Sequence, residues 1–175
     1  MTQTFDPSIL TPADLALARR YAGRKLLRPD LVIGKPEYLY RWYVTPRSEE
    51  ANVYFHIQVM DDPERPLHDH PWDNQSVILS GGYDEIWAKR RYDYDPKVMF
   101  LEPSQTRNVR VGDVVHRKAE EAHRLLLPLK TPYTMTLFST GPHRRDWGFW
   151  TSKGWRKHAD VTDIVDGQAI WKGPA

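Results

Sequence analysis

A series of short alternating segments constrains the fold of this chain more than any other feature. These segments alternate apolar with polar residues and are rich in aromatic and β-branched side chains, which is typical of β-strands. They cover residues 38–45, 52–60, 75–80, 83–91, 98–102, 108–116, 123–129 and 133–140. Gly, Pro, Asp and Asn lie between them, where turns are expected. About eight short strands with no long helix between them predict an all-β sandwich or barrel.

The chain on either side of the strands predicts one helix and one extension. Residues 12–27 repeat leucine and alanine at helical spacing, and Thr11 can cap the helix that Pro12 begins. Residues 141–175 are dense in Trp, Arg and Gly, and we expect them to lie over the barrel or at an interface. A length of 175 residues favours a single domain, residues 1–175, with a barrel core at about 38–140.

Composition excludes several functional classes. The chain has no cysteine, so it has no disulfide, no thiolate nucleophile and no cysteine-ligated metal. A formal net charge of only +2 disfavours a role in nucleic-acid binding. The sequence shows no apolar run long enough to span a bilayer and no signal-peptide pattern at its start. We therefore expect a cytoplasmic protein without a membrane partner.

A His-x-His pair is the first candidate for chemistry. His68 and His70 lie between Pro66 and Pro71, which favour extended or turn backbone over helix. Alternate side chains of an extended segment point the same way, so both imidazoles can reach one metal ion. The alternative is a polar turn that happens to contain two histidines. His123, at the start of a very apolar strand, is a candidate third ligand.

Together these segments resemble the two metal-binding motifs of the cupin superfamily. His68 and His70 match the His-x-His pair of the first motif, and Gly82 matches its closing glycine. In the second motif, Gly112 and His123 are in register. Gln75 stands where the first motif has its acidic ligand, so Gln75 is a further candidate ligand. The His-Asp-His string followed by a strand is similar to that of thiol dioxygenases.

The resemblance implies a cupin-type barrel (a double-stranded β-helix, or jelly roll) with an N-terminal helix and a C-terminal extension. It also implies a divalent metal ion held by His68, His70 and His123. Imidazole suits Fe, Zn, Ni and Cu, and the metal expected first is Fe(II), with Zn, Ni, Mn and Cu as alternatives. Asp69, Asp73 and Glu85 are nearby carboxylates that could orient a ligand through its second ring nitrogen.

Other side chains are candidates for substrate binding or catalysis. His56, Arg41 and Tyr83 lie in predicted strands and could face the barrel interior. An inward guanidinium at Arg41 would bind a substrate carboxylate in bidentate fashion. Beyond the last predicted strand, Arg144, Arg145 and Trp147 could close the mouth of the barrel. For each of these residues, ordinary packing or a solvated surface position is the alternative.

The function expected from the sequence is that of a mononuclear non-haem Fe(II) oxygenase, either a dioxygenase or a hydroxylase. Its substrate would be a small anionic or chelating molecule. One alternative is a metal-dependent isomerase, epimerase or lyase, in which the ion acts only as a Lewis acid. The other alternative is a small-molecule-binding cupin without catalysis. Edge strands of small barrels often pair across a two-fold axis, so a homodimer is expected.

Overall fold

The computed structural model of the chain describes residues 4–63, 66–92, 99–165 and 168–172. Helix α1 is Pro12–Ala22, and the last helix, α2, is His158–Val161. Short 3-10 turns cover Pro7–Ile9 and Gly23–Lys25. The strands of the main body are β1 Leu31–Ile33, β2 Leu39–Tyr43, β3 Asn52–Gln58, β4 Asn74–Ser80, β5 Tyr83–Ala88, β8 Gln105–Val109, β9 Val114–Arg117, β10 Ala122–Leu126 and β11 Thr134–Thr140. Six further strands form three separate pairs. At one end, β6 Arg90–Tyr92 pairs with β7 Met99–Leu101. Near the C-terminus, β12 Gly148–Thr151 pairs with β13 Gly154–Lys157, and β14 Thr162–Val165 pairs with β15 Gln168–Trp171.

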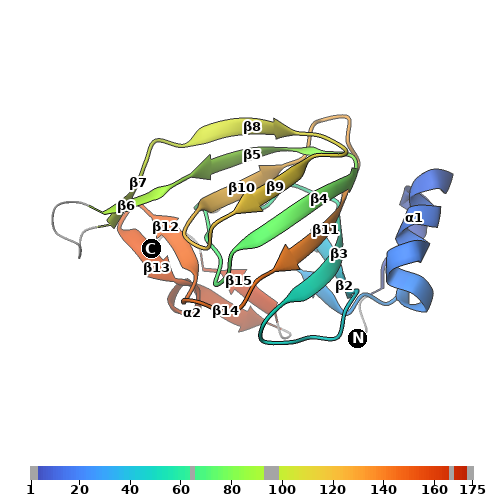
Figure 1. Cartoon of the computed structure of the whole chain (residues 1–175), viewed down its shortest axis with the longest axis horizontal. Coiled ribbons are helices and arrows are strands. Elements are labelled where there is room, and N and C mark those ends of the chain that lie inside the picture. The colour runs from blue at the N-terminus through green and yellow to red at the C-terminus, as the bar shows by residue number, and fades with distance from the viewer. Residues whose placement is uncertain (1–3, 64–65, 93–98, 166–167, 173–175) are drawn as a thin grey trace.

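Two sheets form the body of the molecule (Figure 1). The larger sheet has the strand order β1-β2-β3-β11-β4-β9, and the smaller has the order β10-β5-β8. The pairings within both sheets are antiparallel, and neighbours in space are often far apart in sequence, as β3 and β11 are. The alternating segments predicted this mostly β architecture, and the resemblance to cupins implied its jelly-roll form. None of the helices in the described part of the chain is long and apolar enough to span a membrane.

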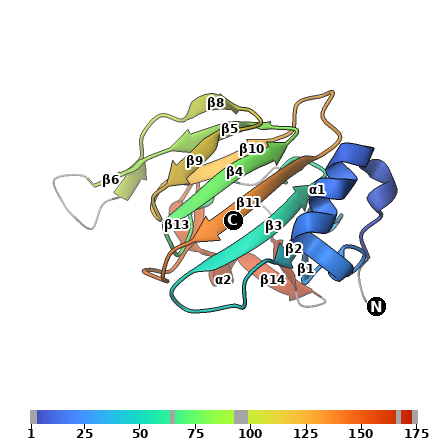
Figure 2. The same cartoon turned by 45° about the vertical axis from the view of Figure 1, so that its right-hand side comes forward.

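The outer face of the larger sheet carries the main hydrophobic core. Trp42, Phe55, Ile57 and Met135 are almost completely buried there. Helix α1 lies beside this face, near β2 and β3 (Figure 2), and contributes two buried alanines to the same cluster. The ring of Phe55 lies 5.5 Å from Trp42 and stacks on Tyr21 of the helix at 5.6 Å.

The inner face of the same sheet carries several polar side chains among apolar ones. His56 and Gln58 from β3, Thr136 from β11, Ser76 from β4 and Arg117 from β9 all line an internal cavity. A sheet that buries polar side chains toward its partner sheet gives up hydrophobic contact at that interface. The space between the two sheets therefore holds a cavity beside a smaller apolar cluster of Ile78, Tyr83, Val109 and Val115, whereas the main apolar core lies under α1.

Three expectations about boundaries are wrong. The strand predicted for residues 83–91 ends at Ala88, and β6 follows as a separate strand. The helix predicted for residues 12–27 ends at Ala22, because Gly23 takes a φ of 56° and the chain continues as a 3-10 turn. Thr11 caps it as expected, since its hydroxyl accepts a hydrogen bond from the Asp14 backbone N–H. The strand predicted for residues 108–116 is two strands, because a tight turn with Gly112 at a φ of 92° separates β8 from β9.

The C-terminal extension lies against the loop that carries the His-x-His pair. The Asp69 backbone N–H donates to the Gly148 carbonyl at 3.1 Å, and the Trp150 N–H donates to Leu67 at 2.9 Å. Gly148 is required at this position, because a Cβ there would lie 2.0 Å from the Arg156 carbonyl oxygen. The extension thus packs over the barrel, as one of the two sequence-based alternatives stated.

Truncating the core beneath α1 should destabilise the fold. Phe55→Ala removes a fully buried ring, so we expect the free energy of unfolding to fall by about 3–5 kcal/mol. Urea denaturation followed by circular dichroism measures this change. The control is Leu129→Ala, at a fully exposed side chain, where the change should stay within about 0.5 kcal/mol. Equal effects in the two variants would contradict the placement of the core.

Candidate metal centre

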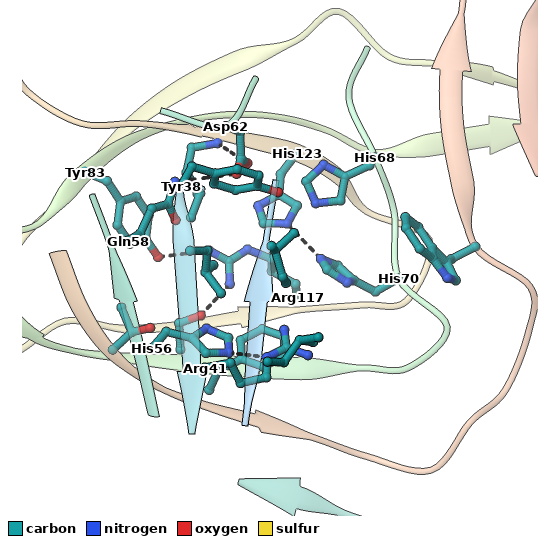
Figure 3. A pocket seen from close by; sticks show the side chains of 18 of the residues that line it. Tyr38, Arg41, His56, Gln58, Asp62, His68, His70, Tyr83, Arg117 and His123 are labelled. Carbon is teal, nitrogen blue, oxygen red and sulfur yellow. Dashed lines mark hydrogen bonds between the residues drawn. The ribbon is translucent and has the colours of Figure 1, made fainter. Parts of the chain in front are cut away.

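Three histidines converge at one place on the cavity wall. One ring nitrogen from each of His68, His70 and His123 lies within 4.8 Å of the other two (Figure 3). The two closest, Nε2 of His70 and Nε2 of His123, are 2.8 Å apart. Backbone hydrogen bonds in both directions between His68 and His123, of 3.1 and 2.8 Å, join the His-x-His loop to β10. The geometry favours the metal-site interpretation of the His-x-His pair over that of a polar turn.

The residue between the two loop histidines points the other way. Asp69 is completely buried and accepts hydrogen bonds from the Gly148 backbone N–H at 2.8 Å and from Trp155 Nε1 at 2.9 Å. Arg145 forms an ion pair with the same carboxylate at 2.9 Å. Because side chains alternate along extended backbone, anchoring Asp69 on one side directs both imidazoles to the other.

Glu85 of β5 contacts the third histidine, His123, at the ring nitrogen that faces away from the cluster. Its Oε1 lies 2.7 Å from Nδ1 of His123 and 2.6 Å from Nε of Arg117, and its Oε2 lies 2.7 Å from Nε of Arg107. A carboxylate can only accept, so His123 carries its proton on Nδ1 and presents the lone pair of Nε2 to the cluster. Of the three carboxylates expected to orient a ligand, Glu85 is the one whose contact with a histidine ring is observed.

Electrostatics keep this arrangement in the state that metal binding needs. Burial alone would raise the pKa of Glu85, but the hydrogen bond from His123 and the charge of Arg117 outweigh it and hold that pKa well below its usual range. Burial, followed by the proximity of His123 and Arg117, holds the pKa of His70 well below its usual value. Glu85 is therefore ionised and His70 neutral at pH 7, so the His70 lone pair is available to a cation.

The donor set fits a divalent transition metal. Two nitrogens bound to one ion at about 2.1 Å and at right angles would lie about 3.0 Å apart, close to the 2.8 Å observed between His70 and His123. Imidazole binds Fe, Ni, Cu and Zn, and three ligands leave coordination positions open to a substrate. Within the described residues, the cluster includes no carboxylate.

The cavity beside the histidines has a volume of about 410 Å³. Apolar side chains of β1, together with Leu39, Leu125 and Phe138, form much of its wall. Trp147 and Phe149 of the C-terminal extension also line it. Trp147 stacks on His158 with ring centroids 4.4 Å apart and planes within 8°. A cavity of this size, mostly apolar with a few convergent polar groups, suits a small molecule.

The remaining candidate residues divide into two groups. Arg41, His56, Tyr83 and Trp147 line the cavity, as expected for residues that could contact a substrate. Nε of Arg41 donates to Nε2 of His56 at 2.8 Å, and Tyr83 lies beside Arg117, whose Nη2 is 3.0 Å from the phenol oxygen. Burial is the first cause that raises the pKa of Tyr83, so its phenol is protonated at pH 7.

Three candidates lie elsewhere. Gln75 does not line the cavity, because on β4 it alternates with Ser76, which does. The exposed Arg144 forms an ion pair with Asp73 at 3.0 Å. Arg145 is held by Asp69 and by the carbonyl oxygens of two residues, His70 and Ala119. In this structure Gln75 is not placed to bind the ion, and the two arginines secure loops outside the cavity.

Arg117 is a functional residue that sequence reasoning missed. It is buried, and besides Glu85 its guanidinium contacts the Ser76 hydroxyl at 3.0 Å. The sequence contained one signal, since Val115 and Arg117 are two residues apart and share a strand face; the structure buries both and exposes His116 between them. Reading the segment as one long strand through Gly112 obscured that alternation.

Comparison with known proteins is informative only at the level of structure. No protein-family model and no curated protein sequence matches the chain. Among solved structures, hydroxypropylphosphonic acid epoxidase from S. wedmorenis matches with a TM-score of 0.47 and 10% identity, over 63% of this chain and 54% of that one. The DMSP lyase DddQ from Ruegeria pomeroyi matches with a TM-score of 0.48 and 17% identity, over 78% and 67%. A cupin superfamily protein from Desulfitobacterium hafniense matches with a TM-score of 0.39 and 13% identity, over 66% and 81%.

These matches are too distant to carry an argument about activity, and this chain aligns with only about half of the epoxidase. The antiparallel two-sheet barrel, with the three motif histidines converging on its interior, decides the fold. The chain has a cupin fold. In this chain Gln75, at the position of the acidic motif residue, is not part of the histidine cluster, and the carboxylate of Glu85 contacts His123 instead.

Removing the third ligand should abolish metal binding without unfolding the protein. His123→Ala takes away one of three donors, and we expect metal content after reconstitution to fall to background. Elemental analysis measures the metal, and circular dichroism checks the fold. His116→Ala, an exposed histidine on the neighbouring strand β9, is the matched control and should retain metal. Full metal content in the His123 variant would overturn the ligand assignment.

Removing the carboxylate behind that ligand should weaken metal binding without abolishing it. In Glu85→Gln the acceptor of the His123 Nδ1 proton loses its charge, so we expect metal affinity to fall about 10- to 100-fold. Competition with a chromophoric chelator measures the affinity. The control is Glu121→Gln, since the Glu121 carboxylate accepts a hydrogen bond from the Lys118 backbone N–H and does not contact Glu85 or His123 in any described hydrogen bond. Unchanged affinity in the Glu85 variant would contradict the orienting role.

Proposed function

We propose that this cupin is a mononuclear Fe(II) oxygenase acting on a small anionic or chelating substrate inside the barrel. One observation carries the proposal: within the described residues the ligand cluster consists of three imidazoles and no carboxylate, and it opens onto the cavity. A structural metal site is usually closed by four protein ligands, whereas three ligands leave positions for a substrate. A metal site with open positions that faces a cavity therefore favours chemistry over a structural role.

The bound ion would supply redox chemistry toward dioxygen, and the protein supplies everything around it. His68, His70 and His123 are the residues that would hold the ion. Three neutral ligands leave its positive charge uncompensated, so an anionic substrate group is favoured at the open positions. This charge balance supports the expectation of an anionic or chelating substrate.

Aromatic side chains surround the histidine cluster. Trp72 stacks on His70 with ring centroids 5.0 Å apart, and Phe138 lies 6.0 Å from the same ring. Trp147 and Phe149 lie near His68, at 6.5 and 6.1 Å between centroids. Aromatic rings around the ligands lower the local dielectric constant and limit side reactions with water. They also restrict the imidazoles to a narrow range of orientations.

The proposal predicts that iron binding and oxygen consumption depend on the same histidines. The chain should be purified anaerobically without a histidine tag, and its metal content measured by elemental analysis. We expect about one iron per chain after reconstitution with Fe(II). An oxygen electrode should then record substrate-dependent O₂ uptake in a screen of small thiols, diketones and carboxylic acids, with the His123→Ala variant inactive and His116→Ala active.

Other outcomes would replace this function with a different one. Tight binding of Zn, Ni or Mn, with turnover that needs no O₂, would favour a Lewis-acid isomerase, epimerase or lyase. Failure to take up any divalent metal would leave a small-molecule-binding protein. Either result would overturn the oxygenase assignment.

A further inference from the structure

A second polar group lies in the cavity, apart from the histidine cluster. Arg41 of β2 and His56 of β3 are directly opposite each other in the sheet, and their side chains are joined by the 2.8 Å hydrogen bond (Figure 3). Both line the same cavity as the three histidines. Neither contacts the cluster through any hydrogen bond described for it, so the pair needs its own explanation.

Arg41 differs from the other arginines near the site. Arg107 and Arg117 share the carboxylate of Glu85, and Arg145 pairs with Asp69. Arg41 has no carboxylate partner within the described part of the chain, and its one described hydrogen bond uses only Nε. The guanidinium remains charged at neutral pH, and its Nη groups are left as donors. A charge held inside a protein without a counter-ion is costly unless a ligand supplies one.

The hydrogen bond also fixes the state of His56. Because Nε of Arg41 can only donate, Nε2 of His56 accepts, and the ring proton lies on Nδ1. Burial, and then the charge of Arg41, hold the pKa of His56 well below its usual value, so the ring is neutral at pH 7. The pair therefore carries one positive charge, and the groups it has left to offer are N–H donors. This occupation of Nε2 argues against His56 as a general base.

The pair is held rigidly. The Cζ atom of Arg41 lies 4.5 Å from the ring centroid of Tyr54, and the His56 ring stacks on Phe138 at 5.3 Å. Tyr54 and Phe138 also stack on each other at 6.4 Å. Because aromatic rings cover the faces of the guanidinium and the imidazole, the N–H groups at the edges of Arg41 and His56 are the part available to a ligand. A site preorganised in this way loses little side-chain entropy on binding.

We infer that Arg41 and His56 form the binding site for a substrate carboxylate. The inference rests on the proposed function, in that the same substrate would approach the three histidines with its other end. A carboxylate accepts only, is planar and carries one negative charge, which matches an arginine fork beside a neutral N–H donor. A phosphonate is tetrahedral and carries up to two negative charges, so it matches neither the planar fork nor the single positive charge of the pair. The pair therefore selects small monocarboxylates.

Binding of simple probes to the full-length chain tests this site without any turnover. Propionate, propionamide and methylphosphonate are titrated into histidine-¹⁵N-labelled protein, with and without Zn(II) as a diamagnetic ion. The His56 imidazole signals, assigned with a His56→Gln variant, report binding. We expect the free protein to show the Nδ1–H form of His56. We also expect propionate to shift its signals in both preparations, and propionamide and methylphosphonate to bind much more weakly.

The deciding variant is Arg41→Met, which removes the charge but keeps the length of the side chain. We expect its dissociation constant for propionate to rise about 10- to 100-fold. Arg47→Met is the matched control, because Arg47 is an exposed arginine beyond the same strand whose Cζ lies over Tyr43 at 5.6 Å, outside the cavity. Its dissociation constant should be unchanged.

Three results would overturn the inference. These are propionate binding that persists in Arg41→Met, binding that occurs only with Zn(II) and disappears in His123→Ala, and tighter binding of methylphosphonate than of propionate. None of them would affect the metal assignment, which is measured separately by metal content. Conversely, propionate binding in a chain that takes up no metal would keep the carboxylate site and reject the oxygenase.

Discussion

The buried carboxylate of Glu85 is the interaction on which the rest of the site depends. Glu85 and His123 belong to the smaller sheet, whereas Arg117 belongs to β9 at the edge of the larger one. Their contacts therefore cross the interior and join the two sheets, in addition to the smaller apolar cluster of Ile78, Tyr83, Val109 and Val115. Removing one member of such a buried ion-pair group leaves the others with uncompensated charge. The resulting loss in the free energy of unfolding is far larger than the stabilisation that a surface ion pair provides. The same carboxylate fixes the tautomer of His123, so the stability of the barrel and the orientation of a metal ligand share one origin.

The division of the larger sheet into two unlike faces explains how a small domain can hold a cavity of this kind. A cavity of about 410 Å³ between the sheets sacrifices packing that would otherwise stabilise them. The outer face compensates, because α1 covers a cluster of fully buried aromatic and aliphatic side chains there. In most antiparallel sheets one face is apolar and the other solvated. Here the second face turns toward the cavity, and the alternation within β3 places His56 on that face and Phe55 on the other.

The sequence revealed local features and missed long-range ones. Strand periodicity and the motif registers were enough to predict the barrel and to select His68, His70 and His123, because each depends on spacing along the chain. The partners of Glu85 could not be found in the same way, since Arg107 and Arg117 reach it only once β8 and β9 are separate strands with their own registers. Arg144 and Arg145 looked like residues of a barrel mouth, but ion pairs with Asp73 and Asp69 hold them outside the cavity. The presence of an arginine in a loop does not indicate whether it will bind a substrate or pair with a neighbouring carboxylate.

The C-terminal extension contributes to the site as much as the barrel does. His68 and His70 point inward because Asp69 between them is anchored on the opposite side of the backbone. Its carboxylate contacts Gly148, Trp155 and Arg145. The extension also returns Trp147 and Phe149 to the cavity wall beside the histidines. Each ligand segment is thus restrained on the side away from the ion, His123 by Glu85 and the His-x-His loop by the extension. Because these restraints involve only protein groups, the fold itself directs the three imidazoles toward one another.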